Sequence, residues 1–372
     1  MKLLFYSPVD LCAGLGCERW HCDVTNSLKN KFGHQIKIIT GNLGYKRWSE
    51  TYLLSQLQSI PHERLNYPIV ISSLIPTPGI FFKLLTEFRL ADTVHFIHGF
   101  IGQDILMAIL KILTRKRVVV GHHAPMFHFS AIHNLYMRCV SRYVLKIFDA
   151  HMALNCQDAK ALLNWGIKNI HFIPSGVRVE RFLSLPRKTH SHLNFLSVGR
   201  YDTPQKGFDL LLEAIAKFNQ KYPHNKAVFR FAGSGGSRNP INNYAQKADN
   251  IIDLGFVMYE DMPKIYSFSD IFLLSSREEP FGLILVEAWS SGIPVLATKT
   301  EGPKDMLLPG KNGWFFDEIS VSGILTGIEK IYRLWIADRS KIIQLEKNCR
   351  DTGKIYSIDI TAYKMDQNLF NL

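Results

Sequence analysis

Three carboxylates surround a glycine in the stretch 275–294, SSREEPFGLILVEAWSSGIP. Glu278 and Glu279 precede Gly282 in an expected loop, and Glu287 lies about one turn inside the helix expected after it. Helix N-termini bind phosphate because their unpaired N–H groups and the helix dipole both point toward the preceding loop. A carboxylate beside a phosphate is repelled unless it contacts something else, such as sugar hydroxyls. The stretch therefore suits a phosphorylated, hydroxyl-rich ligand, and it fits equally a plain strand–loop–helix unit with solvated glutamates.

Two cations, Arg200 and Lys206, lie between Gly199 and Gly207 in the loop after another expected strand. In a parallel sheet this loop lies on the same edge as the helix start at Gly282. An Arg fork and a Lys point charge can hold a diphosphate together. The sequence contains no Asp-x-Asp pair, which argues against a metal-chelated nucleotide. We therefore expect neither a metal nor a cofactor here, whereas two basic residues on a solvated loop are the alternative.

The first half carries polar residues at the ends of its expected strands. Gly16 stands in a strand, loop, helix, strand pattern, where a glycine lets backbone N–H groups approach a phosphate closely. The glycines do not spell GxGxxG, so dinucleotide binding is only weakly indicated. His98, His122 and His123 end two further strands, where open α/β sheets bind ligands. Each of these histidines fits a packing or capping role equally well.

Alternating apolar runs and helical patterns predict two α/β halves. In the first half, strands are expected at 2–6, 35–40, 93–98, 117–120, 150–154 and 171–174. The polar segment 184–191 is expected to be a linker. Beyond it, strands are expected at 194–198, 228–232, 251–254, 271–274 and 295–297, with helical patterns at 322–349 and 358–370. Two such sheets predict a cleft between them, the usual place for a ligand.

Composition narrows the classes of protein that fit. The 372 residues are 47% hydrophobic, enough for two or three cores, and no apolar run reaches the length of a membrane span. The six cysteines form no CxxC pair, which argues against a zinc site and suits a reducing cytosol. Residues 1–180 hold 20 Lys and Arg against 11 Asp and Glu, and the rest holds 24 against 21. The basic first half favours an anionic membrane surface or a phosphorylated substrate over nucleic acid, for which no motif is present.

These motifs together resemble the retaining glycosyltransferases of family four, which have the GT-B fold. The second half matches at 197–200 (SVGR), 206–209 (KGFD), 232–235 (AGSG), 279–287 (EPFGLILVE), 292–295 (GIPV) and 312–316 (NGWFF). The first half matches at 16–19 (GCER), 94–99 (VHFIHG), 123–125 (HAP) and 173–177 (IPSGV). The resemblance covers nearly the whole chain. Leu15 and Arg178 depart from the family pattern, which has a glycine and often an acid at these places.

The resemblance implies a role for each matching residue. Arg200 and Lys206 would bind the donor diphosphate and stabilise the leaving group. Glu279 would contact donor sugar hydroxyls, and Glu287 the ribose. The other expected contacts are Gly16 under the phosphates, the backbone N–H groups of Phe281, Gly282 and Leu283, and His123, or else His122, near the reacting sugar and acceptor. No protein nucleophile is needed if the leaving phosphate helps to deprotonate the acceptor.

The implied fold is α/β of GT-B type, with two doubly wound Rossmann-like domains facing each other across a cleft. Residues 1–183 would form the acceptor-side domain and residues 184–355 the donor-binding domain. Residues 356–372 would form a C-terminal helix that crosses back to the first domain.

The implied function is metal-independent transfer of a hexose-type sugar, with retention, from a nucleotide-diphosphate sugar to a glycan, glycolipid or lipid-linked acceptor. Such a hexosyltransferase would serve the synthesis of cell-surface polysaccharide, lipopolysaccharide or another glycoconjugate. We expect it in the cytoplasm, with the inner face of the cytoplasmic membrane as a further hypothesis. A nucleotide-sugar 2-epimerase of the same fold and a non-catalytic binding protein remain the alternatives.

Overall fold

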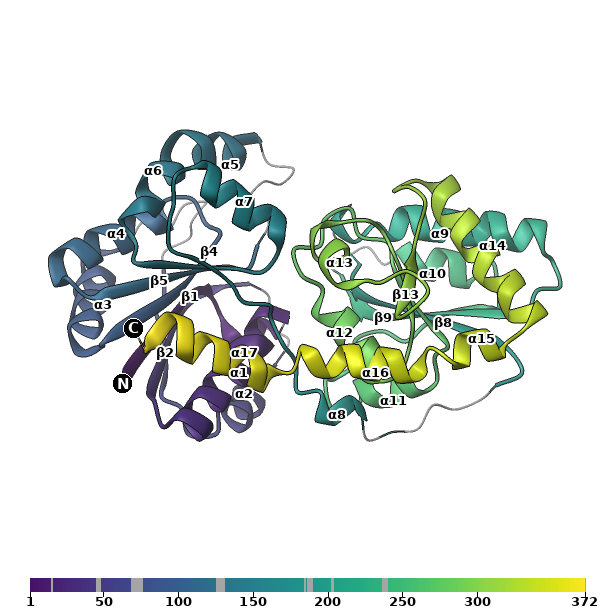
Figure 1. Cartoon of the computed structure of the whole chain (residues 1–372), viewed down its shortest axis with the longest axis horizontal. Coiled ribbons are helices and arrows are strands. Elements are labelled where there is room, and N and C mark those ends of the chain that lie inside the picture. Colours follow the sequence, from purple (N-terminus) through teal and green to yellow (C-terminus); the bar gives the residue numbers. More distant parts are fainter. Residues whose placement is uncertain are drawn as a thin grey trace. The chain divides into compact units, whose positions relative to one another are not determined.

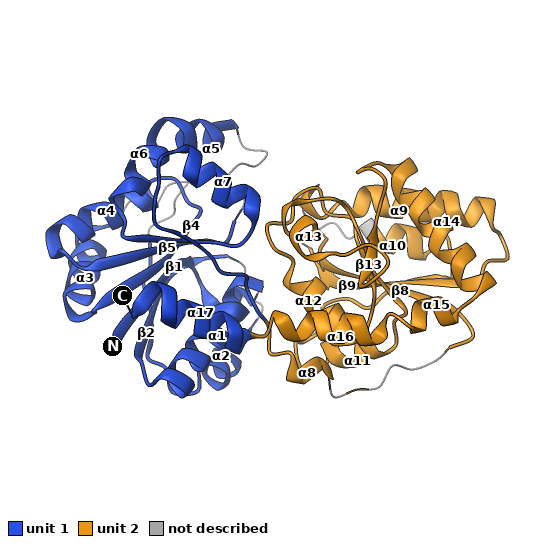
Figure 2. Ribbon diagram, viewed as in Figure 1, with its two compact units in different colours: residues 1–176, 358–372 blue, residues 177–357 orange. Residues whose placement is uncertain are grey.

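The chain divides into two compact units (Figure 2). The computed structural model describes residues 1–14, 16–44, 48–67, 76–124, 131–183, 185, 190–201, 204–235 and 240–371. Unit 1 comprises Met1–Gly176 and Ile358–Leu372, and unit 2 comprises Val177–Ser357.

A parallel seven-stranded sheet forms the centre of unit 1, in the order β3-β2-β1-β4-β5-β6-β7. Its strands are β1 (Lys2–Val9), β2 (Gln35–Leu43), β3 (His62–Arg64), β4 (Thr93–His98), β5 (Arg117–His122), β6 (Ala150–Ala153) and β7 (Ile170–Phe172). Most residues of β1, β4, β5 and β6 are buried, as expected of parallel strands with helices on both faces. The strands expected from the apolar runs are all present, whereas the short polar strand β3 was not predicted.

Helices cover both faces of this sheet (Figure 1). One face packs on α3 (Pro78–Leu90), α4 (Gln103–Thr114), α5 (Ala131–Tyr136), the π-helical turn η2 (Met137–Ser141), α6 (Arg142–Val144), the 3-10 turn η3 (Leu145–Ile147) and α7 (Cys156–Asn164). The other face packs on α1 (Gly16–Phe32), α2 (Glu50–Leu57) and α17 (Ile358–Met365). Alternate residues of β1 point to the two layers: Leu4 and Tyr6 to the first, Phe5 to the second.

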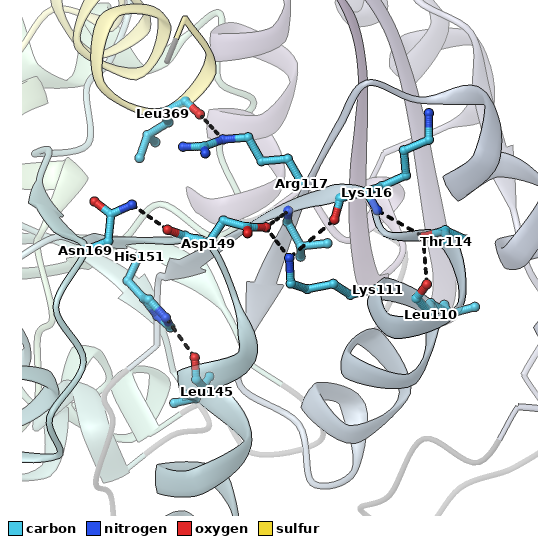
Figure 3. A network of polar contacts seen from close by, with 11 residues as sticks. Leu110, Lys111, Thr114, Lys116, Arg117, Leu145, Asp149, His151, Asn169 and Leu369 are labelled. Carbon is cyan, nitrogen blue, oxygen red and sulfur yellow. Dashed lines mark hydrogen bonds and ion pairs between the residues drawn. The ribbon is translucent and has the colours of Figure 1, made fainter.

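The C-terminal segment belongs to unit 1, as predicted for a helix that crosses back to the first domain. The hydroxyl of Thr361 donates to the carbonyl oxygen of Pro174 at 2.9 Å, and the buried His34 and Asp366 lie 2.6 Å apart. The side chain of Arg117 on β5 donates to the carbonyl oxygen of Leu369 at 3.1 Å (Figure 3). Strand β5 and the end of the chain are thus bonded directly.

Asp149 ties α4 to the sheet (Figure 3). Its carboxylate accepts from the ammonium of Lys111 at 2.5 Å and from the backbone N–H of Val118 at 2.7 Å. Its carbonyl oxygen accepts from the amide of Asn169. The end of α4, the start of β5 and the segment before β7 therefore meet at one residue.

Unit 2 contains a parallel six-stranded sheet in the order β10-β9-β8-β11-β12-β13. Its strands are β8 (Leu193–Arg200), β9 (Ala227–Ser234), β10 (Ile251–Asp253), β11 (Ile271–Leu274), β12 (Val295–Ala297) and β13 (Gly313–Phe315). Its helices are α8 (Glu180–Leu183), η4 (Pro204–Lys206), α9 (Phe208–Lys221), α10 (Pro240–Ala245), α11 (Met262–Ser267), α12 (Leu283–Ser290), α13 (Glu301–Met306), α14 (Val321–Ala337), α15 (Ser340–Ile343) and α16 (Glu346–Ile355). A core of Phe, Leu and Ile side chains joins β8, β9 and β11 to α9 and α14.

Two parallel α/β units confirm the predicted fold class. Most of the segment 184–191, expected as a linker, lies outside the described residues. None of the described helices is long and apolar enough to cross a membrane.

Candidate functional site

Two loops of unit 2 touch at the carboxyl edge of its sheet. One joins β8 to α9 and the other joins β11 to α12. A Cβ atom on Gly207 would lie 2.1 Å from the carbonyl oxygen of Ser275, and Gly207 has a φ of +64°. The Ser275 hydroxyl donates to the carbonyl oxygen of Lys206 at 2.9 Å. Position 207 therefore needs glycine both for its backbone conformation and for this close approach.

The structure brings Lys206 and Glu279 together across these loops. The ammonium Nζ of Lys206 lies 2.6 Å from Oε2 of Glu279, and the two side chains are 17% and 10% exposed. The Ser276 hydroxyl lies 3.5 Å from the same carboxylate oxygen. A cation and a hydrogen-bond acceptor thus share a largely enclosed position, where charge interactions are stronger than in bulk water.

Helix α12 begins at this position. Gly282 is its N-cap with a φ of +95°, and no side chain caps the helix there. The N–H of Gly302 donates to the carbonyl oxygen of Glu279 at 2.8 Å, and a Cβ on Gly302 would lie 2.2 Å from the carbonyl oxygen of Phe281. The Phe281 ring is buried against Tyr356, at 5.9 Å between centroids. Phe281, Gly282 and Leu283 therefore present backbone at the helix start.

Arg200 and Arg277 lie on the same two loops. Arg200 ends β8, and its Nη2 donates to the side-chain oxygen of Gln205 at 3.3 Å. Arg277 forms a bidentate ion pair with Asp209 on α9, from Nη1 to Oδ1 at 2.7 Å and from Nη2 to Oδ2 at 2.6 Å. Its hydrogen bonds with Asp209 lower the pKa of that carboxyl. Arg277 also donates to the carbonyl oxygen of Pro204, so it fastens one loop to the other.

Glu287 lies deeper in the unit than the other predicted donor contacts. Its side chain is buried within α12, and its Oε2 accepts a hydrogen bond from the hydroxyl of Tyr266 at 2.9 Å. Tyr266 itself is fully buried beside Phe272. The predicted ribose contact of Glu287 stays a prediction.

In unit 1 the two neighbouring histidines have different surroundings. His122 is buried, and its Nε2 lies 3.1 Å from Nδ1 of His151. His123 is partly exposed and lies against Trp20, at 4.2 Å between ring centroids. Burial lowers the pKa of His123 well below its ordinary value, and the neighbouring His95 adds to this. His123 is therefore the more exposed of the two histidines, although its Nε2 is buried, and it is neutral at neutral pH.

Gly16 and His123 are connected through α1. Gly16 is the first residue of α1, and Trp20 lies one turn further along it. The neighbouring Leu15 lies outside the described residues. The start of α1 and the end of β5 thus meet at the carboxyl edge of the unit 1 sheet.

The sequence did not reveal several of these contacts. Trp20 was an ordinary aromatic residue of a helical pattern, and Asp209 and Arg277 lie too far apart in sequence to be paired by spacing. Only the positions of Asp209 and Arg277 in the sequence could have indicated this pair. Asp209 directly follows the KGF segment, and Arg277 directly precedes the EEPFG segment.

Comparison with known proteins agrees with this picture. Residues 187–350 match the model of the family described as glycosyl transferases group 1. This match lies wholly within unit 2, so it is the second half of the chain that is similar to this family.

Among curated proteins, the chain is 29% identical over 158 residues to the lipopolysaccharide core biosynthesis glycosyltransferase LpsE of Rhizobium meliloti, covering 42% of this chain and 43% of LpsE. The chain therefore spans less than half the length of the first curated relatives it matches. An uncharacterized glycosyltransferase of Haemophilus influenzae is 23% identical over 358 residues, covering 92% of this chain and 95% of that protein.

Among solved structures, Anabaena Alr3699/HepE in complex with UDP and glucose superimposes with a TM-score of 0.76 at 18% identity, covering 100% of both chains. A likeness at this identity establishes the fold, which is that of the GT-B glycosyltransferases.

Proposed function

We propose that the chain is a glycosyltransferase that moves a hexose-type sugar from a nucleotide-diphosphate sugar to a glycan, glycolipid or lipid-linked acceptor. The proposal rests above all on the contact between Lys206 and Glu279 at the uncapped start of α12. The match of unit 2 to the group 1 glycosyltransferase model and the glycosyltransferases among the relatives support it. UDP-sugars are the first donors to test, because HepE binds UDP and glucose.

The proposed chemistry follows from the charges at the site. Lys206 and Arg200 would neutralise the diphosphate as it departs, which lowers the barrier most when such groups are already in place. The N–H groups at the start of α12 would add to this stabilisation. Glu279 would accept hydrogen bonds from donor hydroxyls, and a hydroxyl-rich sugar is the ligand for which an acid beside a diphosphate is favourable.

We further propose that transfer proceeds with retention and without a metal. Two cations from the protein would take the charge-neutralising role of a metal ion. His123, neutral at neutral pH, would hydrogen-bond to the reacting sugar or the acceptor. Nuclear magnetic resonance of the product's anomeric centre would test retention, and unchanged turnover in a chelator would test the absence of a metal.

The deciding experiment compares purified wild type with Lys206→Ala and Glu279→Ala. Wild type should transfer sugar from a radiolabelled donor to a lipid-linked or glycan acceptor, and both variants should lose transfer while circular dichroism stays unchanged. Full activity in either variant would refute the site assignment. Incubation with donor alone separates the epimerase alternative, which would release a changed sugar nucleotide without any acceptor.

A further inference from the structure

One helix layer of unit 1 is unusually apolar on its outer surface. This layer comprises α3, α4, residues 131–147 and α7, which together contain 51 residues. Among the described residues of the chain, 22 large hydrophobic side chains are exposed, and 11 of them lie on this layer. A seventh of the chain therefore carries half of its exposed large apolar side chains, a concentration typical of an interaction surface.

The apolar residues of α4 form a continuous stripe. Ile105, Ile109 and Ile112 follow one another at spacings of four and three, so they lie on one side of the helix. Their exposed fractions are 40%, 43% and 62%. The opposite side of α4 is buried in the core of unit 1 through Leu106 and Leu110. Helix α4 is thus apolar on both sides, although only one side is covered by protein.

The segment 131–147 extends this surface and adds charge. Ile132, Leu135 and Tyr143 are 73%, 64% and 54% exposed. The guanidinium of Arg142 lies 4.5 Å from the centre of the Tyr143 ring, and the ammonium of Lys146 lies 5.8 Å from it. An aromatic ring with two cations beside it suits a membrane interface, where the ring enters the headgroup region and the cations meet lipid phosphates.

The acidic side chains of this layer are buried. Its four helical segments hold seven Lys and Arg residues and three acids. All three acids, Glu87, Asp104 and Asp158, are buried. The carboxylate of Asp104 accepts hydrogen bonds from Tyr136 and Ser141, and that of Glu87 pairs with lysines. No acid of these helices is therefore exposed among the apolar and basic side chains.

We propose that this layer, through α4 and residues 131–147, docks on an anionic lipid surface. A membrane with acidic headgroups supplies both an apolar interior for the isoleucines and negative charge for Arg138, Arg142 and Lys146. A second copy of the chain is a poorer occupant, because a symmetric contact would pair this layer with itself, and its helices offer no exposed acid to the cations. The proposal does not depend on the transfer reaction.

The test is sedimentation with vesicles of phosphatidylcholine containing phosphatidylglycerol, compared with pure phosphatidylcholine. Wild type should bind the anionic vesicles at low salt and less at high salt. Arg142→Glu with Lys146→Glu should lower the partition coefficient about tenfold or more. Ile112→Asp should weaken binding at both salt concentrations. The matched controls are Lys330→Glu with Arg333→Glu, and Ile336→Asp, all on exposed positions of α14 in unit 2; they should bind like wild type.

Three results would overturn the proposal. One is that wild type does not bind anionic vesicles. Another is that Ile112→Asp and the Arg142→Glu, Lys146→Glu variant bind as well as wild type does. A dimer seen by sedimentation velocity that Ile112→Asp abolishes, without vesicle binding, would assign the layer to a second copy. The rise in melting temperature on adding a nucleotide sugar should be equal in all variants, which separates this proposal from that of the donor site.

Discussion

At the scale of single residues, the carboxylate of Glu279 is proposed to have two effects. It would accept hydrogen bonds from the donor sugar, and it would repel the phosphates of the nucleotide. Glu279 pairs with Lys206, the residue expected to hold the donor diphosphate. A diphosphate arriving at Lys206 must therefore compete with Glu279 or share the cation with it. In the proposed site, Glu279 would be unfavourable for a bare nucleotide and favourable only when sugar hydroxyls are present to donate to it.

Glu279→Gln should separate these two effects. We expect it to lose sugar transfer while it binds free UDP more tightly, by about 1 kcal/mol or about fivefold, because a negative charge near the phosphates is removed. Isothermal titration calorimetry measures the affinity. Glu278→Gln is the control on the same loop, because Glu279 and not its neighbour pairs with Lys206; burial and Glu301 raise the pKa of Glu278. Weaker UDP binding by Glu279→Gln would contradict this account.

Asp209 and Arg277 should matter for binding more than for stability. The ion pair is partly exposed, so Asp209→Asn should change the free energy of unfolding by less than about 1 kcal/mol. It should nevertheless weaken nucleotide binding, because Arg277 fastens the two loops that carry Lys206 and Glu279. Glu213→Gln, which removes an exposed pair with Lys217 on the same helix, should leave binding unchanged. Calorimetric titration of both variants with nucleotide decides whether the ion pair of Asp209 and Arg277 supports nucleotide binding.

At the scale of elements, the sequence was informative where its periodicity was strong. The long apolar runs predicted β1, β4, β5 and β11, and the structure confirms them. The strands β3 and β13 were missed because each is a short edge strand without an apolar run: β3 reads His-Glu-Arg, and β13 begins with a glycine. Spacing also predicted Lys206 and Glu279, but not Trp20 beside His123, because that contact depends on how α1 packs on the sheet.

The contact between the two loops of unit 2 should be sensitive to a single methyl group. Gly207→Ala would add a Cβ atom 2.1 Å from the carbonyl oxygen of Ser275, so the loops must separate. Gly310→Ala provides a matched control, because Gly310 also has a positive φ, of +76°, and no atom within 4 Å of its added Cβ. The control should lose only about 1 kcal/mol of folding free energy from backbone strain. Gly207→Ala should lose more, and equal losses in urea unfolding would refute the contact.

At the scale of the whole molecule, the two units should respond differently to acid. Burial lowers the pKa of His21 to about 4, of His95 to about 3 and of His151 to about 4, and all three belong to unit 1. These histidines are neutral in both folded and unfolded chains above about pH 6.5. As the pH falls below that value, the unfolded chain takes up protons first, so unit 1 loses stability down to the folded pKa values.

At pH 5.5 this loss should reach about 1.4 kcal/mol for each of the three histidines. Hydrogen exchange followed by mass spectrometry would measure it, after correction for the intrinsic effect of pH on exchange. Peptides of unit 1 should lose protection between pH 7.5 and pH 5.5, whereas peptides of unit 2 serve as the internal reference. Equal changes in both units would mean that these buried histidines do not set the acid response.

The return of α17 to unit 1 has a consequence for the order in which the chain is made. A ribosome releases the β-strands of unit 1 first, then all of unit 2, and only then the residues that contact Ser27 and His34. Unit 1 therefore lacks α17, and one side of α1 stays uncovered, until unit 2 has been synthesised. Unit 2 can fold alone during this time. We expect nascent chains stalled after Ser357 to show a protease-resistant unit 2 beside a protease-sensitive unit 1. Resistance of unit 1 in such chains would show that it completes its fold without its last helix.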